Sequence, residues 1–306
     1  MLDQATELRK LVLRSVREPP ADGSPSPPLL VVCGGCSGVG VTTLSVHLAV
    51  ALSGQGCRVV LVDADLHRPG VASACGLTGE AGIAEVLAAR RDIHEVLQPG
   101  PGGVQVVAGR ASAGHPADWG EVAQQRLLRQ LKKLGRHADV IALDAGSGGH
   151  EVLRRFWRAA DEVVLVTTPD PQAVMDAYAA IKRLAGANAT AVLRLLVNRA
   201  TDSSIAKDVH QRICEASERF LELALGLLGS IPNDPAFETA GPPGTVWATR
   251  DGDNPASLAL DAIAAQLIAN RQRPVSVARP RAQVTSDVRN SAGLAQPEPW
   301  FSPIDI

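Results

Sequence analysis

A glycine-rich stretch near the start of the chain, LLVVCGGCSGVGVTT at residues 29–43, constrains the fold most strongly. The four apolar residues at 29–32 are typical of a buried strand, and the pattern from Thr42 to Ser53 predicts a helix. The glycines between them permit a tight turn whose backbone N–H groups point toward one place. A strand, a glycine turn and a helix in this order can hold phosphate groups at the helix N-terminus.

The spacing of this turn matches the phosphate-binding loop G-x-x-x-x-G-K-[ST] at every position except the lysine, where Val41 stands. Thr42 would supply its hydroxyl to Mg²⁺ as well as its backbone N–H to phosphate. The expected nucleotide-binding residues of the loop are Gly35, Gly38, Val39, Gly40, Val41, Thr42 and Thr43.

The missing lysine bears on catalysis more than on binding. None of the five lysines (Lys10, Lys132, Lys133, Lys182 and Lys207) lies in the loop. An apolar side chain cannot neutralise phosphate charge, and losing one such electrostatic donor costs on the order of 3 kcal/mol in the transition state. We therefore expect phosphate binding without efficient hydrolysis, a pseudo-ATPase. A second hypothesis keeps the ATPase activity and lets an arginine, Arg68, replace the lysine.

Two further apolar strands end in carboxylates. Arg58–Val62 leads into Asp63 and Asp65, and Val140–Leu143 leads into Asp144. Carboxylates at a strand end can reach a metal-bound water or an attacking water. Asp63, Asp65 and Asp144 are the candidate catalytic residues, and Asp65 joins Thr42 as a candidate Mg²⁺ ligand.

Strands and helices alternate along most of the chain, which predicts an α/β fold with a mostly parallel sheet and helices on both faces. The expected strands are Leu29–Val32, Arg58–Val62, Val104–Val107, Val140–Leu143, Val163–Thr167, Ala191–Val197 and Leu227–Ile231, and the expected helices are Thr42–Ser53, Asp118–Gly135, 171–185, 203–223 and 255–270, with short helical pieces in 81–98. In such sheets a ligand binds beyond the carboxyl ends of the strands.

The chain divides into four parts by composition. Residues 1–18 carry an apolar stripe at helical spacing, and 19–28 form a Pro/Ser/Gly linker. The α/β domain is expected at 29–270, and 271–306 has the Pro- and Arg-rich composition of a disordered tail. The net charge of −2 gives no general attraction to nucleic acid or membrane. The odd number of cysteines, five, indicates free thiols in a reducing compartment, so we expect a cytoplasmic protein.

These motifs together resemble the MinD/ParA group of P-loop ATPases, whose loop reads K-G-G-x-G-K-[ST]. In this comparison Cys36 stands at the signature lysine and Val41 at the ordinary one. The resemblance covers 29–270 and implies ATP or ADP with Mg²⁺ as ligands and an ATP-dependent homodimer. It also implies that two segments contact the purine, which adds Asn198, Arg199, Pro232 and Asp234 to the nucleotide-binding residues.

The first residues of the chain indicate which family within this group the chain resembles. Residues 3–9 match D-Q-A-x-x-L-R, a segment that resembles the N-terminus of the FlhG (FleN or YlxH) family of flagellar-number regulators. In that family the segment stimulates FlhF, a signal-recognition-type GTPase that sets where flagella form. The resemblance therefore implies an FlhF-like partner, recruitment to the inner membrane face or cell pole, and partner-binding residues Asp3, Gln4, Ala5, Leu8 and Arg9.

Two alternatives remain beside this interpretation. One is an active MinD/ParA-type ATPase switch for cell-division or partition positioning. The other is a ParA-like partition protein that works on DNA. The near-neutral charge argues against nucleic-acid binding, and none is expected.

Overall fold

The computed structural model describes residues 26–79, 81–109, 120–148, 151–184, 191–234 and 254–272. The predicted N-terminal helix, most of the linker and all but the first two residues of the predicted tail lie outside these ranges. The partner-binding residues predicted at Asp3, Gln4, Ala5, Leu8 and Arg9 lie outside them as well.

Eight strands form one sheet, in the order β3-β4-β2-β5-β1-β6-β7-β8. All neighbouring pairs are parallel except β3 and β4, which are antiparallel. The strands are β1 (Leu29–Gly34), β2 (Val59–Asp63), β3 (Gln98–Pro99), β4 (Gln105–Val107), β5 (Val140–Ser147), β6 (Glu162–Thr167), β7 (Val192–Ala200) and β8 (Gly226–Pro232). The predicted α/β fold is confirmed.

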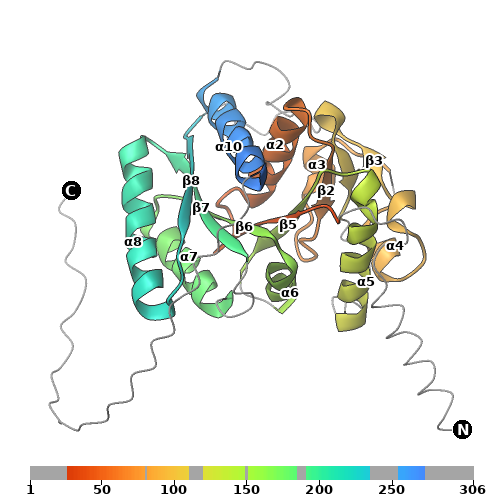
Figure 1. Cartoon of the computed structure of the whole chain (residues 1–306), viewed down its shortest axis with the longest axis horizontal. Coiled ribbons are helices and arrows are strands. Elements are labelled where there is room, and N and C mark those ends of the chain that lie inside the picture. Colours follow the sequence, from red (N-terminus) through yellow and green to blue (C-terminus); the bar gives the residue numbers. More distant parts are fainter. Residues whose placement is uncertain are drawn as a thin grey trace, which may run out of the picture. The chain divides into compact units, whose positions relative to one another are not determined.

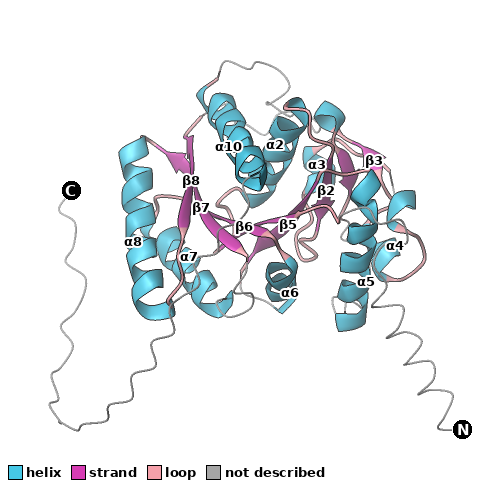
Figure 2. Cartoon of the chain, viewed as in Figure 1, coloured by secondary structure: helices cyan, strands magenta, loops and turns pink. Residues whose placement is uncertain are grey.

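Helices cover both faces of this sheet, as Figures 1 and 2 show. The α-helices are α2 (Val41–Gly54), α3 (Val71–Ala74), α4 (Ile83–Leu87), α5 (Glu121–Lys132), α6 (Glu151–Ala159), α7 (Pro171–Leu184), α8 (Ser203–Leu221) and α10 (Pro255–Gln272), and the short 3₁₀ turns are η1 (Ile93–Glu95), η2 (Pro101–Gly103) and η4 (Lys133–Arg136). Helices α2 and α10 pack together over one face, and α5 to α8 lie on the other.

The central strand β1 is buried along its whole length. Because side chains alternate along a strand, Leu30 and Val32 join the core beneath α2 and α10, whereas Val31 and Cys33 join the core on the opposite side. A strand buried on both faces consists of consecutive apolar residues, and this apolar run is why the sequence predicts β1 clearly.

Three short helices or strands were missed by the sequence-based prediction, and the first is the four-residue helix α3. Helix α6 has nine residues and buries Leu153, Phe156 and Trp157. The edge strand β3 has two residues and pairs in the antiparallel sense. All three are short enough that tertiary contacts, rather than local pattern, decide whether they form. No helix among the described residues is long and apolar enough to cross a bilayer.

Candidate functional site

The loop between β1 and α2 is shaped by glycines and by its contact with α7. Gly38 and Gly40 have φ angles of 87° and 96°, which side-chain-bearing residues rarely adopt. A Cβ atom on Gly35 would lie 2.4 Å from the backbone N of Ala177 and the backbone C of Asp176. The loop thus needs glycine at positions 38 and 40 because of their positive φ angles, and at position 35 because the backbone of α7 leaves no room for a side chain.

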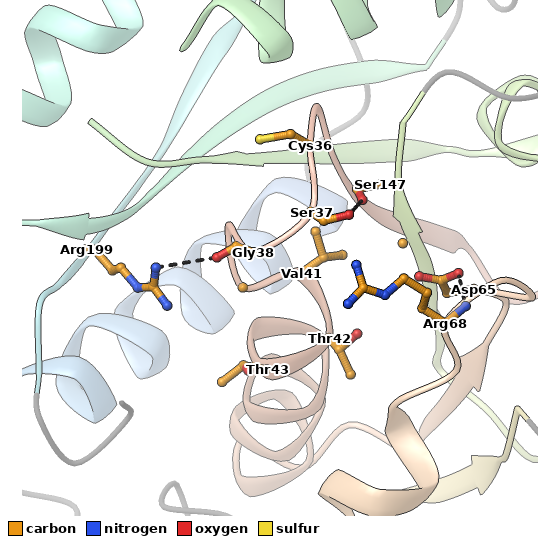
Figure 3. A pocket seen from close by; sticks show the side chains of 12 residues that line it. Cys36, Ser37, Gly38, Val41, Thr42, Thr43, Asp65, Arg68, Ser147 and Arg199 are labelled. Carbon is orange, nitrogen blue, oxygen red and sulfur yellow. Dashed lines mark hydrogen bonds between the residues drawn. The ribbon is translucent and has the colours of Figure 1, made fainter. Parts of the chain in front are cut away.

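Helix α2 begins directly after this loop, and its first turn has no side-chain cap at Gly40. The first N–H groups of a helix have no partner within the helix, so they are available to an anion, and the helix dipole adds to the attraction. The turn faces a cavity of about 320 Å³, which Figure 3 shows from close by. We call it the phosphate cavity, because the sequence predicts that this loop holds phosphate. Its lining residues are Cys36, Ser37, Gly38, Gly40, Val41, Thr42, Thr43, Asp65, Arg68, Gly146, Ser147 and Arg199.

Val41 is only 7% exposed and belongs to the apolar core under α2. It therefore offers the cavity no charge, as the sequence predicted. Cys36 lies on the rim of the same cavity, half-buried, and burial followed by the charge of Asp176 on α7 raises its thiol pKa. A thiol held in its neutral form supplies no positive charge either.

Two arginines reach the cavity from other parts of the chain. Arg68 comes from the turn after β2 and Arg199 from the carboxyl end of β7. The Nη1 atom of Arg199 donates to the carbonyl of Gly38 at 3.4 Å, a bond drawn in Figure 3. Both cations line the same cavity as Val41, although they are distant from it in sequence.

Two of the predicted catalytic carboxylates come together, Asp63 as the last residue of β2 and Asp144 inside β5, which continues to Ser147 instead of ending before Asp144 as predicted. Asp63 and Asp144 are register partners in the sheet, and both are fully buried. Burial, with the neighbouring charge of Asp144, raises the pKa of Asp63 to about 7. Burial also raises the pKa of Asp144 to about 6, opposed by the Thr42 hydroxyl and the Gly146 N–H.

Each of these two carboxylates has one oxygen without a hydrogen-bond partner among the described residues, Oδ1 of Asp63 and Oδ2 of Asp144. The other oxygen of Asp63 accepts the backbone N–H groups of Gly70 and Val71 at 3.1 and 3.0 Å. Neither carboxylate lines the cavity, but each lies two residues before one that does, Asp65 or Gly146. Buried polar atoms are normally satisfied, so an unpartnered carboxylate oxygen at this place suits a metal-bound water.

A smaller cavity of about 40 Å³ adjoins the first and contains the residues predicted to contact a purine. Gly40, Thr43, Leu44, Asn198, Arg199, Ile231, Pro232, Asn233 and Asp234 line it. Asn198 also braces the loop, because its Nδ2 donates to the carbonyl of Val39 at 2.8 Å. This bracing contact was not predicted, since it joins residues 159 positions apart.

The residues around the phosphate cavity fit a magnesium nucleotide. A cradle of backbone N–H groups, the Thr42 hydroxyl beside Asp144, and the unpartnered carboxylate oxygens suit polyphosphate with Mg²⁺. Among the described residues no three His, Cys, Asp or Glu side chains gather as a metal site. Mg²⁺ in nucleotide sites is usually held by one or two protein oxygens together with waters and phosphate oxygens.

Two further contacts connect the loop region with the end of β5 and the residue after it. The hydroxyls of Ser37 and Ser147 lie 3.3 Å apart, and the N–H of Gly148 donates to the carbonyl of Gly34 at 3.0 Å. The predicted loop and carboxylate segments therefore form one connected site.

Comparison with known proteins gives one family and several named relatives. A family model described as ParA, NUBPL iron-transfer P-loop NTPase, matches residues 28–268. The antiactivator FleN of Pseudomonas aeruginosa is 34% identical over 212 residues, covering 69% of this chain and 76% of FleN. The flagellum site-determining protein YlxH of Helicobacter pylori is 27% identical over 245 residues, covering 76% of this chain and 79% of YlxH.

Among solved structures, the septum site-determining protein MinD of Pyrococcus horikoshii, in complex with Mg-ADP, superposes with a TM-score of 0.65. The match covers 80% of this chain and 98% of that one, at 20% sequence identity. At this identity the likeness establishes the fold alone.

Proposed function

Because the chain belongs to the ParA family of P-loop NTPases, we propose that it is an FlhG-type regulator of flagellar number and placement. In this proposal residues 1–18 stimulate an FlhF-type GTPase, and the phosphate cavity binds ADP or ATP. The observation that carries it is the D-Q-A-x-x-L-R segment at residues 3–9, ahead of a domain that is 34% identical to FleN. The protein would act in the cytoplasm, at the membrane face or cell pole.

The nucleotide part of the proposal rests on the cavity beside α2. The loop N–H groups and Arg199 would bind the phosphates, and Asn198, Pro232 and Asp234 would border the base. Thr42 and Asp65 would hold Mg²⁺, which neutralises phosphate charge when bound. Asp63 and Asp144 would hold the surrounding water and fix the positions of the two strand ends.

Efficient ATP hydrolysis needs a positively charged side chain in the loop, whereas nucleotide binding can rely on the backbone N–H groups. A lysine at the Val41 position would stabilise the charge that develops on the transferred phosphoryl group. Val41 is buried in the core and uncharged, so we propose a slow or absent ATPase and a role that depends on partner binding.

An active ATPase switch for cell-division or partition positioning is the second candidate. Arg68 in the cavity favours it, because it brings a positive charge to the site. Mg²⁺-dependent ATP hydrolysis by the purified protein at the rate of an ordinary member of the family would support this candidate and contradict a pseudo-ATPase.

The deciding experiment measures GTP hydrolysis by a purified FlhF-type GTPase with and without this protein. Wild-type protein is expected to stimulate it severalfold, whereas a variant lacking residues 1–18 and the Gln4→Ala variant are expected not to. Lys10→Ala changes the same segment outside the motif and serves as the matched control, with stimulation retained. If the wild-type protein leaves GTP hydrolysis unchanged, the proposed regulatory function is wrong.

A further inference from the structure

We propose that Arg68 supplies the positive charge that the loop lacks at Val41, so that the terminal phosphates of a nucleoside diphosphate or triphosphate bind between the loop N–H groups and the Arg68 guanidinium. This inference rests on the nucleotide-binding part of the proposed function. It concerns a different element from the loop, since Arg68 belongs to the turn between β2 and α3.

The charge of the cavity comes from few side chains. Among the described residues, its lining contains two cationic side chains, Arg68 and Arg199, one carboxylate, Asp65, and no lysine. Arg199 already donates to the carbonyl of Gly38, so part of its hydrogen-bonding capacity is used within the protein. The guanidinium of Arg68 makes no hydrogen bond or ion pair with any described residue.

The backbone of the turn fixes where the Arg68 side chain starts. The Oδ1 atom of Asp65 accepts the N–H groups of His67 and Arg68 at 3.1 and 2.9 Å. At the other end of the turn, Asp63 accepts the N–H groups of Gly70 and Val71. Two carboxylates thus hold the turn on either side of the arginine.

The turn also lies close to the start of α2. A Cβ atom on Gly70 would lie 3.1 Å from Cγ2 of Thr42, so the turn and the first turn of the helix are nearly in contact. In Figure 3 the guanidinium of Arg68 points into the cavity toward Val41 and Thr42, while its backbone N–H is bonded to Asp65. The cation therefore lies on the side of the cavity where a loop lysine is missing.

An arginine suits this role chemically. The guanidinium has five N–H donors in a planar arrangement that can bind phosphate through two hydrogen bonds at once. Its long side chain reaches the cavity from outside the loop, so Val41 can remain in the core. Because the same turn contains Asp65, a phosphate bound to Arg68 would also restrain the candidate Mg²⁺ ligand.

The test is calorimetric binding of ADP and AMP, with Mg²⁺, to full-length protein. Arg68→Ala is expected to weaken ADP binding about tenfold or more, because hydrogen bonds between charged groups are stronger than those between neutral groups. AMP binding should change much less. Arg68→Lys should restore part of the loss. Arg212→Ala, an exposed arginine paired with Asp208 on α8, is the matched control and should bind ADP as wild type does.

A double-mutant cycle with Val41→Lys gives the sharper result. If Arg68 and a lysine at that position serve the same phosphates, Val41→Lys should improve ADP binding more in the Arg68→Ala background than in the wild type. Equal effects in both backgrounds, or ADP binding unaffected by Arg68→Ala, would overturn the inference while leaving nucleotide binding intact. A wild-type protein that does not bind ADP at all would contradict both this inference and the nucleotide-binding part of the proposed function. Unchanged thermal unfolding of each variant without nucleotide shows that it is folded.

Discussion

At the scale of single residues, the glycines of the loop differ in why they are required. A Cβ on Gly38 would meet no described atom within 4 Å, but its φ is 87°, so its requirement is conformational. Gly35 has no such φ, but the backbone of α7 occupies the place of its side chain. Gly40 is required for both reasons. Its φ is 96°, and the side-chain amide nitrogen of Asn198 lies 2.5 Å from the place that a Cβ atom would take. The loop is therefore held by α7 and β7 as much as by its own sequence.

Gly35→Ala should lower the free energy of unfolding by about 1–3 kcal/mol, because overpacking forces the surrounding backbone to shift. Gly54→Ala is the matched control: it ends α2, has open space at its Cβ and should be neutral or slightly stabilising. Urea denaturation of both variants measures the difference. Equal stability of the two variants would show that the loop does not pack against α7 as described.

At the scale of elements, the pairing of β2 with β5 brings two buried carboxylates, Asp63 and Asp144, into register. The pKa of Asp63 is raised to about 7 by burial and by the charge of Asp144. A carboxyl group with a raised pKa is more easily protonated in the folded protein than in the unfolded chain, where its pKa is ordinary. Its contribution to stability is thus fully present below the unfolded pKa of roughly 4 and is lost as the pH rises through about 7.

Asp63→Asn should therefore flatten this pH dependence in the protein free of metal and nucleotide. Relative to wild type, the variant should gain about 1–2 kcal/mol of unfolding free energy between pH 5 and pH 8, because asparagine stays neutral. Asp208→Asn on α8, an exposed position, is the matched control with an unchanged slope. The measurement is urea denaturation at several pH values. Parallel curves for wild type and Asp63→Asn would contradict the buried, proton-binding carboxylate.

At the scale of the whole molecule, the site exists only because four strands end at one edge of the sheet. Strand β1 leads into the loop, β2 and β5 carry the carboxylates, and β7 carries Asn198 and Arg199. A ligand that binds across these ends joins segments from both halves of the domain. Binding should accordingly stabilise the folded domain as a unit.

Mg-ADP at a hundred times its dissociation constant should stabilise the fold by about 2.7 kcal/mol. For a domain of this size the melting temperature should rise by roughly 5–10 °C. Differential scanning calorimetry with ADP, and with adenosine as the ligand without phosphates, measures the effect. The shift should persist in a variant lacking residues 1–18, because the lining residues named above lie between positions 36 and 234. A melting temperature that stays constant up to millimolar Mg-ADP would argue against a nucleotide site.

Much of the fold was predictable because its signals are local. Apolar runs marked the strands, and glycine spacing marked the phosphate loop. Asp63 in β2 and Asp144 in β5 were also identified from their positions after apolar runs. Helices α3 and α6 and strand β3 were missed, because elements of four, nine and two residues carry little periodic signal.

The sequence by itself determined where the chain can turn tightly, which faces of the strands and helices are buried, and that position 41 carries no charge. The order of the strands and the groups that meet at their ends were decided only by the tertiary structure. Asn198 braces the carbonyl of Val39, and Arg68 enters the cavity beside Val41, through contacts that no local pattern encodes. The physical reason is that backbone conformation and burial follow from neighbouring residues, whereas the charge of a cavity is the sum of side chains that packing brings together from distant parts of the chain.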